Sequence, residues 1–218
     1  IHDRSGIDMK RVAIVVSLTL GLAANGFAAD ARPAGDISAG KSQAVACGAC
    51  HGADGNAASP FPKLAGQGEK YLYKQLLDIR DGARPVPTMA GQLDGKSNQD
   101  LADIAAYYAS LTRSGGQTSP AMLELGEKIY RSGVAERKVA ACTACHSPTG
   151  KGNAPAGYPS LAGQNAQYVA DQLRAYRNGY EDSSGRTNDG EAKIMRTTAF
   201  GLSDKEIEAV SSYVSGLH

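Results

Sequence analysis

Apolar residues recur at helical spacing near the end of each half of the chain. Between residues 97 and 112 they form one stripe at intervals of three or four: Leu101, Ile104, Ala105, Tyr108 and Leu111. A second stripe near the C-terminus contains Ile207, Val210, Val214 and Leu217. The first stripe predicts a helix that starts at Ser97 or Asn98, and Ser203 with Glu206 has the spacing of a capping box for the second. Convincing alternating apolar runs are absent, so the pattern indicates an all-α fold.

A different apolar pattern opens the chain. Met9-Lys10-Arg11 is a short cationic segment, an apolar run follows at 12–24, and small residues lead to Ala28. This order predicts that residues 1–28 are upstream residues and a signal peptide, cleaved after Ala28 on export to the periplasm. The apolar run is shorter than the roughly 20 residues of a membrane-spanning helix, although an uncleaved anchor remains the alternative.

Most of the remaining chain is an internal repeat. FPKLAGQ at 61–67 recurs as YPSLAGQ at 158–164, and YLYKQLLDIRDG at 71–82 recurs as YVADQLRAYRNG at 168–179, at a constant offset (158 − 61 = 97). A repeat of this length indicates a duplicated domain rather than a solenoid unit. We therefore expect a first domain at 29–112, a polar, glycine-rich linker at 113–119 and a second domain at 120–218.

Each of these domains contains one Cys-x-x-Cys-His pattern. The residues are Cys47, Cys50 and His51 in the first, and Cys142, Cys145 and His146 in the second. This pattern is typical of c-type haem, whose vinyl groups bond to the two thiols while the imidazole binds the iron. A zinc ribbon places its pairs roughly 15–20 residues apart, whereas 142 − 50 = 92 positions separate these. A thioredoxin-type thiol pair explains neither the duplication nor the histidines, so we expect two covalently bound haem c groups.

Few histidines remain to bind iron from the opposite side. Without residues 1–28, only the C-terminal His218 accompanies His51 and His146, so ligation by two histidines is not expected. Pro62 follows His51 at a distance (62 − 51 = 11) close to that of Pro159 after His146 (159 − 146 = 13). The two proline carbonyls are candidates to accept the second N–H of each imidazole, but on spacing alone they are equally well interpreted as loop-terminating prolines.

Methionine spacing predicts the second axial ligands. Met89 precedes Tyr107 by as many positions as Met195 precedes Tyr213 (107 − 89 = 213 − 195 = 18). We therefore expect Met89 and Met195 to bind iron, and Met122, which has no counterpart, to fill the core. Ligation by histidine and methionine favours ferrous iron and leaves no open coordination position, which suits electron transfer.

The charge balance argues against one class of partner. The whole chain has 23 basic and 22 acidic residues, and removal of residues 1–28 leaves 20 of each. No cluster of lysine or arginine stands out, so we expect no nucleic acid partner.

The second half is longer than the first by one segment. The interval from Gln164 to Met195 (195 − 164 = 31) exceeds that from Gln67 to Met89 (89 − 67 = 22) by nine. The nine extra residues lie around 180–190 and include four charged ones: Glu181, Asp182, Arg186 and Asp189. We expect a solvated excursion, with a docking site for a partner as the alternative.

The chain after residue 28 resembles the dihaem cytochrome c4 family. The resemblance is carried by CGACHGADG and CTACHSPTGKG, the two Pro-x-Leu-Ala-Gly-Gln segments, the YxxxQLxxxRxG helices, the two methionines and the terminal helices with their tyrosines. It implies two class I cytochrome c domains, in which Gly40 and Gly126 pack closely against the terminal helices near Tyr107 and Tyr213. It also implies that both proline carbonyls accept the histidine N–H groups, and that the two haems approach each other by their propionate edges.

The same resemblance implies an electron carrier rather than an enzyme. Family members work in respiratory chains, often at the membrane periphery, so the implied partners are redox proteins: a terminal oxidase and an upstream cytochrome or copper-protein donor. The alternative is the dihaem electron-accepting subunit of a sulfide-oxidising flavocytochrome complex. A dihaem peroxidase needs an iron with a coordination position that is open or can become open. A thiosulfate dehydrogenase with a cysteine ligand needs a cysteine outside the haem pairs, which this chain lacks.

Overall fold

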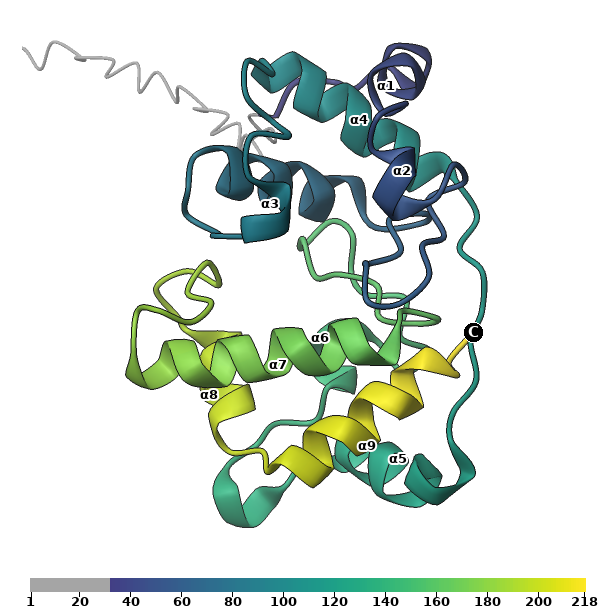
Figure 1. Cartoon of the computed structure of the whole chain (residues 1–218). Helices are drawn as coiled ribbons and strands as arrows, with labels where there is room; N and C mark the ends of the chain where they lie inside the picture. The colour runs from purple at the N-terminus through teal and green to yellow at the C-terminus, as the bar shows by residue number, and fades with distance from the viewer. Residues whose placement is uncertain (1–31) are drawn as a thin grey trace, which may run out of the picture. The chain divides into compact units, whose positions relative to one another are not determined.

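The computed structural model of the protein describes residues 32–218 (Figure 1). The predicted signal peptide at 1–28 lies outside these residues. Within 32–218, no helix combines the length and the hydropathy that crossing a lipid bilayer requires.

Helices and loops make up the two halves, which follow the same order. The first half contains α1 (Ile37–Gln43), α2 (Gly48–His51), α3 (Glu69–Arg80), the 3₁₀ helix η1 (Pro87–Met89) and α4 (Asn98–Ser110). The second contains η2 (Pro120–Met122), α5 (Leu123–Ser132), η3 (Ala135–Arg137), α6 (Thr143–His146), α7 (Ala166–Glu181), α8 (Ile194–Phe200) and α9 (Asp204–Ser215). The β pairing recorded in residues 32–218 is limited to isolated bridges. The predicted all-α fold is confirmed.

Both predicted terminal helices begin at capping boxes. Ser97 precedes α4, where its hydroxyl accepts a hydrogen bond from the backbone of Asp100 and the Asp100 carboxylate accepts one from the backbone of Ser97. Ser203 and Glu206 make the same exchange at the start of α9. These bonds satisfy donors that have no partner inside the helix, which explains why both helices start where the sequence predicts.

Each terminal helix packs against the first α-helix of its half (Figure 1), and a glycine lies at each contact. In the first half α1 meets α4 at Gly40, beside Tyr107, and in the second half α5 meets α9 at Gly126, beside Tyr213. At both contacts the backbone of the terminal helix occupies the space that a Cβ would need. The close packing implied by the resemblance is therefore present in both halves.

The two halves have separate hydrophobic cores. The first consists of Ala44, Leu72, Ile104, Ala105 and Tyr108. The second is larger and consists of Ile129, Tyr130, Val139, Val169, Ala170, Leu202, Ile207, Val210, Tyr213 and Val214. Met122 belongs to neither, so its predicted core role is wrong. The turn η2 places it at the N-cap of α5, where it is half-buried, rather than on the buried face of that helix.

The extra segment of the second half is not a solvated excursion throughout. Arg186, near its middle, is only 6% exposed. Its guanidinium donates hydrogen bonds to the side-chain oxygens of Gln75 in the first half and Gln172 in the second, both at 2.7 Å. The expected solvated loop is wrong at this position, because cross-half hydrogen bonds compensate the burial of a polar side chain.

Other residues of this segment are also held against the protein. The Asn188 amide donates to the Asp78 carboxylate of the first half at 2.6 Å. Asp189 forms a nearly buried ion pair with Arg196 at 2.6 Å. Of the four charges that an exposed docking rim would use, Arg186 and Asp189 are thus engaged inside the protein, while the two acidic residues before them are exposed.

Residues 113–119 connect the halves without forming a helix and are attached to both. The backbone N–H of Ser114 donates to Asn56 of the first half at 2.8 Å. The backbone N–H of Ser119 donates to Ser212 of the second half at 2.9 Å.

Candidate haem sites

Two short helices present the Cys-x-x-Cys-His residues. Cys47 is the N-cap of α2 and His51 its last residue, and Cys142 and His146 have the same places in α6. In each helix the backbone N–H of the histidine donates to the backbone carbonyl of the first cysteine at 2.9 Å. One helical turn therefore holds two thiols and an imidazole together, and all four cysteines are free thiols.

Burial raises the pKa of the leading thiol of each motif. It raises the pKa of Cys47 above its ordinary value and raises the pKa of Cys142 to about 11. Thioredoxin-type nucleophiles act as thiolates and have lowered pKa values, so the raised values argue against that alternative. Within residues 32–218 there is also no group of three His, Cys, Asp or Glu side chains that could hold a metal ion, which argues against a zinc site.

Both motif histidines are buried, neutral and oriented by a proline carbonyl. His51 Nδ1 lies 3.1 Å from the Pro62 oxygen, and His146 Nδ1 lies 2.9 Å from the Pro159 oxygen. A carbonyl can only accept, so Nδ1 carries the proton in both rings and Nε2 keeps its lone pair. Burial lowers the pKa of both imidazoles, which keeps them neutral at pH 7. The Nε2 lone pair of each ring is therefore available to bind a metal.

Aromatic side chains that the sequence reasoning did not single out complete this orientation. Phe61 stands edge-on to His51 with ring centroids 6.3 Å apart, and Tyr158 stands edge-on to His146 at 6.4 Å. Each comes directly before the proline that orients the histidine, as the first residue of the repeated segment. The recurrence of an aromatic residue at this position in both halves was the sequence feature that could have identified them.

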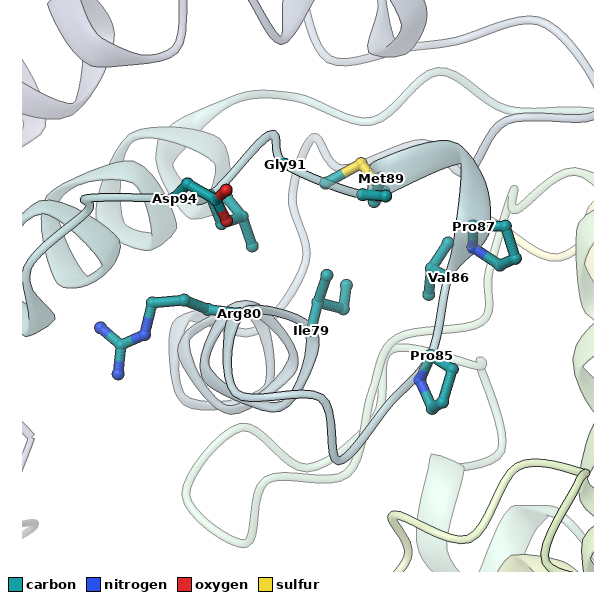
Figure 2. Close-up of a pocket in the computed structure, with 10 residues that line it drawn as sticks. Ile79, Arg80, Pro85, Val86, Pro87, Met89, Gly91 and Asp94 are labelled. Atoms are coloured by element: carbon teal, nitrogen blue, oxygen red, sulfur yellow. The ribbon is translucent and has the colours of Figure 1, made fainter.

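Met89 lines a cavity in the first half. It ends η1, which starts at Pro87, and is half-buried. The cavity measures ≈ 290 Å³ and is lined by Ile79, Arg80, Pro85, Val86, Pro87, Met89, Ala90, Gly91, Leu93 and Asp94. Figure 2 shows Met89 on the loop that arches over α3, across from Ile79. The motif residues of α2 are not among the walls of this cavity.

Met195 occupies a different local structure. It is the second residue of α8 and is half-buried, whereas Met89 ends a 3₁₀ helix. The extra segment leads into α8 through Lys193, which has a left-handed backbone with φ 49°. The two methionines are therefore equivalent in their spacing to the terminal tyrosine but not in secondary structure.

Arg84 and Arg186 occupy equivalent places in the two halves. The backbone N–H of Arg84 donates to the carbonyl of Asp78, and that of Arg186 donates to the carbonyl of Ala175, both at 2.8 Å. The two carbonyls are one repeat apart, since 175 − 78 = 97, but the arginines are further apart, since 186 − 84 = 102. Five of the extra residues therefore precede Arg186 and hide the correspondence in the sequence.

These two arginines share their acceptors across the boundary between the halves. Each guanidinium donates to the side-chain oxygens of both Gln75 and Gln172, at 2.7–2.9 Å. Each also reaches a tyrosine hydroxyl of the opposite half, Tyr168 at 3.1 Å for Arg84 and Tyr71 at 3.5 Å for Arg186. No carboxylate of residues 32–218 forms an ion pair with either arginine, although both are more than nine-tenths buried.

Two further cations lie at the same boundary. Lys63 is 8% exposed and donates to the linker carbonyls of Ser114 and Gly115. Burial lowers the pKa of Arg113 to about 10, and its Nη2 has no hydrogen-bond partner in the part of the chain that the structure describes. Burying several like charges without a carboxylate is costly, so the region between the halves suits an anionic ligand.

The residues present fit two covalently attached haems. Paired thiols and neutral imidazoles with a free Nε2 are the donor set of c-type haem. The first core is small, so an apolar group would add to the area that it buries, and the buried cations suit the two carboxylates that each haem carries.

The cytochrome c family model matches this chain twice, at residues 37–112 and 123–218. Cytochrome c4 of Azotobacter vinelandii is 50% identical over 220 residues, which cover 96% of this chain and 100% of that protein. The crystal structure of reduced recombinant cytochrome c4 from Pseudomonas stutzeri aligns with a TM-score of 0.81 and 51% identity, over 85% of this chain and 100% of that one. A thiosulfate dehydrogenase electron acceptor of Stutzerimonas stutzeri (strain A1501) is 38% identical over 184 residues, 80% of each chain. The protein therefore belongs to the dihaem cytochrome c4 family, and it is an electron carrier with two tandem cytochrome c domains that bind covalently attached haem c.

Proposed function

We propose that this cytochrome works in the periplasm and carries electrons from an upstream cytochrome or copper protein towards a terminal oxidase of a respiratory chain. The observation that carries the proposal is the pair of equivalent His–Pro sites, each matched by a methionine at the same spacing from a terminal tyrosine. The signal-peptide pattern of residues 1–28 supports the location. Peripheral contact with the membrane is part of the proposal, because a terminal oxidase is a membrane partner.

The proposed axial ligands are His51 with Met89 in the first domain, and His146 with Met195 in the second. Bound haem supplies an iron that accepts and releases one electron. The histidines hold their proton at Nδ1 and keep Nε2 for the metal. The thioether of methionine is a soft, neutral donor that favours the ferrous state. Ligation by these histidines and methionines would leave no coordination position for water or substrate, as an electron carrier requires.

Arg84 and Arg186 are proposed to hold haem carboxylates. Guanidinium groups match carboxylates in geometry and charge, and these two have neutral acceptors in the described residues. The proposed domains are 29–112 and 120–218, joined by the linker at 113–119. The hydrogen bonds that attach this linker to both halves support its assignment.

A second candidate function is that of electron acceptor for a sulfur-oxidising dehydrogenase. The thiosulfate dehydrogenase electron acceptor of Stutzerimonas stutzeri (strain A1501) is 38% identical and covers four-fifths of the chain. A role as the dihaem subunit of a sulfide-oxidising flavocytochrome belongs to the same class of function. In either role the chain receives electrons and leaves the oxidation of sulfur to its partner.

One experiment distinguishes these functions. The reduced protein is mixed with oxidase-containing membranes, and the oxidised protein with a thiosulfate dehydrogenase or a sulfide-oxidising flavoprotein, while haem absorption is followed. Respiratory delivery predicts fast, cyanide-sensitive oxidation by membranes. Fast reduction by the sulfur enzyme, with no oxidation by membranes, would favour the second function instead.

Replacement of either ligand methionine is expected to change one haem only. Met89→Ala and Met195→Ala should each remove about half of the far-red sulfur-to-iron absorption and lower one midpoint potential, because water or hydroxide stabilises ferric iron relative to a thioether. Spectral redox titration measures both effects. Met122→Ala is the control, since Met122 lies at the N-cap of α5. Loss of the band in that variant, with retention in Met195→Ala, would show that the second ligand is misassigned.

Removal of either buried guanidinium is expected to affect both haems. Arg186→Gln and Arg84→Gln should each lower both midpoint potentials, by the equivalent of about 1 kcal/mol per electron, because a nearby buried cation favours the reduced iron. The two variants should behave alike, since the arginines are equivalent. Arg131→Gln is the control, because Arg131 is exposed and pairs with Glu127 on its own helix. Potentials that do not move in either variant would argue against the proposed carboxylate contacts.

A further inference from the structure

Two peptide groups connect the motif histidines to the opposite half of the protein. The peptide that joins Pro62 to Lys63 accepts a hydrogen bond from His51 through its C=O, at 3.1 Å, and donates one to Gln164 Oε1 through its N–H, at 2.8 Å. The first bond stays within the first half, and the second crosses to the second half. One amide plane therefore lies between an imidazole and a glutamine from different domains.

The second half repeats this arrangement with the roles exchanged. The peptide that joins Pro159 to Ser160 accepts from His146 at 2.9 Å and donates to Gln67 Oε1 at 2.8 Å. Gln67 and Gln164 are one repeat apart, since 164 − 67 = 97. Each histidine is thus linked through a single peptide to the glutamine of the other half.

The orientation of each glutamine is determined by its own hydrogen bonds. Gln164 Nε2 donates to the Lys63 carbonyl at 2.8 Å, and Gln67 Nε2 donates to the Ser160 carbonyl at 3.0 Å. Both side chains are buried, with 4% of Gln164 and 6% of Gln67 exposed. A flipped amide would place two donors or two acceptors face to face, so Oε1 must point to the peptide N–H.

We propose that Gln164 and Gln67 are positioning residues that strengthen the Nδ1 hydrogen bond of the opposite domain's histidine, so that docking of the two domains sets the potential of each iron. The inference rests on the proposed function, in which His51 and His146 bind iron. Hydrogen bonds in a chain polarise one another. When the glutamine Oε1 accepts from the peptide N–H, the C=O of the same peptide becomes a better acceptor for the imidazole. A more strongly bonded Nδ1–H makes Nε2 a better electron donor, which stabilises ferric iron and lowers the potential.

The geometry predicts that a change in one domain alters the potential of the other domain. Glutamines that only hold the domains together would not produce this crossed effect. Gln164→Met, a change in the second domain, should raise the potential of the first domain and leave that of the second unchanged. Gln67→Met should do the reverse. In half-reduced protein, the ratio of electrons on the two domains should change about threefold, towards the first domain for Gln164→Met and towards the second for Gln67→Met, since polarisation changes a hydrogen bond by roughly 10–30%.

The test uses the full chain with both haems, and NMR redox titration follows the haem methyl resonances of each domain. The Nδ1 proton of each histidine is observed in the same samples and reports its hydrogen bond directly. Gln167→Met is the matched control, because Gln167 is exposed and its side chain donates to Asp171, one turn later on α7 and in the same half. Small-angle scattering reports whether the domains remain docked.

The expected result is a crossed shift in potential, with movement of the Nδ1 resonance of the opposite histidine and no change in the control. If Gln164→Met separates the domains, both links are broken, and both Nδ1 resonances and both potentials must move together. Docked variants with unchanged potentials, or separated domains with unmoved Nδ1 resonances, would overturn the inference alone. Absence of any haem-shifted His51 or His146 resonance in the wild-type protein would overturn the proposed ligands as well.

Discussion

Alanine at Gly40 is expected to destabilise the first domain severely. A Cβ at this position would lie 1.9 Å from the Asp103 carbonyl oxygen and 2.9 Å from the Cβ of Tyr107. The terminal helix is not free to retreat, because the Asp103 carboxylate also accepts a hydrogen bond from the backbone of Asp36 at 2.8 Å. Steric overlap with backbone costs more than the usual 1–3 kcal/mol of an overpacked core, and about 3 kcal/mol or more is a large share of domain stability.

Haem absorbance during denaturant unfolding measures this effect. The first-domain signal should be lost at much lower denaturant in Gly40→Ala, while the second domain unfolds as in the wild type. Gly126→Ala should act on the second domain, where the new Cβ would lie 2.3 Å from the Ala209 carbonyl. Gly115→Ala is the control, because no atom of residues 32–218 beyond Gly115 and its chain neighbours lies within 4 Å of the added Cβ. A wild-type unfolding curve for Gly40→Ala would mean that α1 and α4 do not pack as described.

Removal of both thiols from one motif should remove one haem from the chain. In Cys47→Ala with Cys50→Ala, the first domain retains His51 but has no sulfur to form the covalent links. Intact-mass analysis should find one haem per chain instead of two, with that remaining haem bound to the second domain. The same double change at Cys142 and Cys145 should leave the haem of the first domain.

Because the first core is small, loss of its haem should also destabilise the first domain. Its buried members include two alanines, so the apolar area available without haem is limited. We expect the first domain of the thiol-free variant to be largely unfolded, by amide hydrogen exchange, while the second remains protected. Two haems retained per chain would contradict covalent attachment through these cysteines.

Features that depend on neighbours in the sequence were predictable. The capping boxes at Ser97 and Ser203 act over three residues, and each Cys-x-x-Cys-His motif occupies one helical turn. The glycine contacts and proline carbonyls required the family resemblance, since spacing alone leaves the partner of Gly40 or Pro62 undetermined.

Features that depend on contact between the domains were not predictable from periodicity. Gln67 and Gln164 stand in the repeated segment, but a repeat does not show that each copy bonds to the other. Arg186 was assigned to solvent because polar loops usually face water, and its equivalence to Arg84 was hidden by five inserted residues. Met122 was assigned to the core because it has no counterpart in the first half, but the turn η2 places it at the N-cap of α5.

The glutamine exchange has a consequence for the ancestry of the chain. Each half contributes the same amide and the same peptide, so two identical copies of one half would satisfy the contact as a symmetric homodimer. Gene fusion then makes this association independent of concentration, because a short tether holds the copies at a high effective concentration. The contact uses the backbone of Lys63 and Ser160, whose side chains have diverged without loss of the bond. The bond therefore depends on the glutamines at 67 and 164, whereas the side chains at 63 and 160 take no part in it.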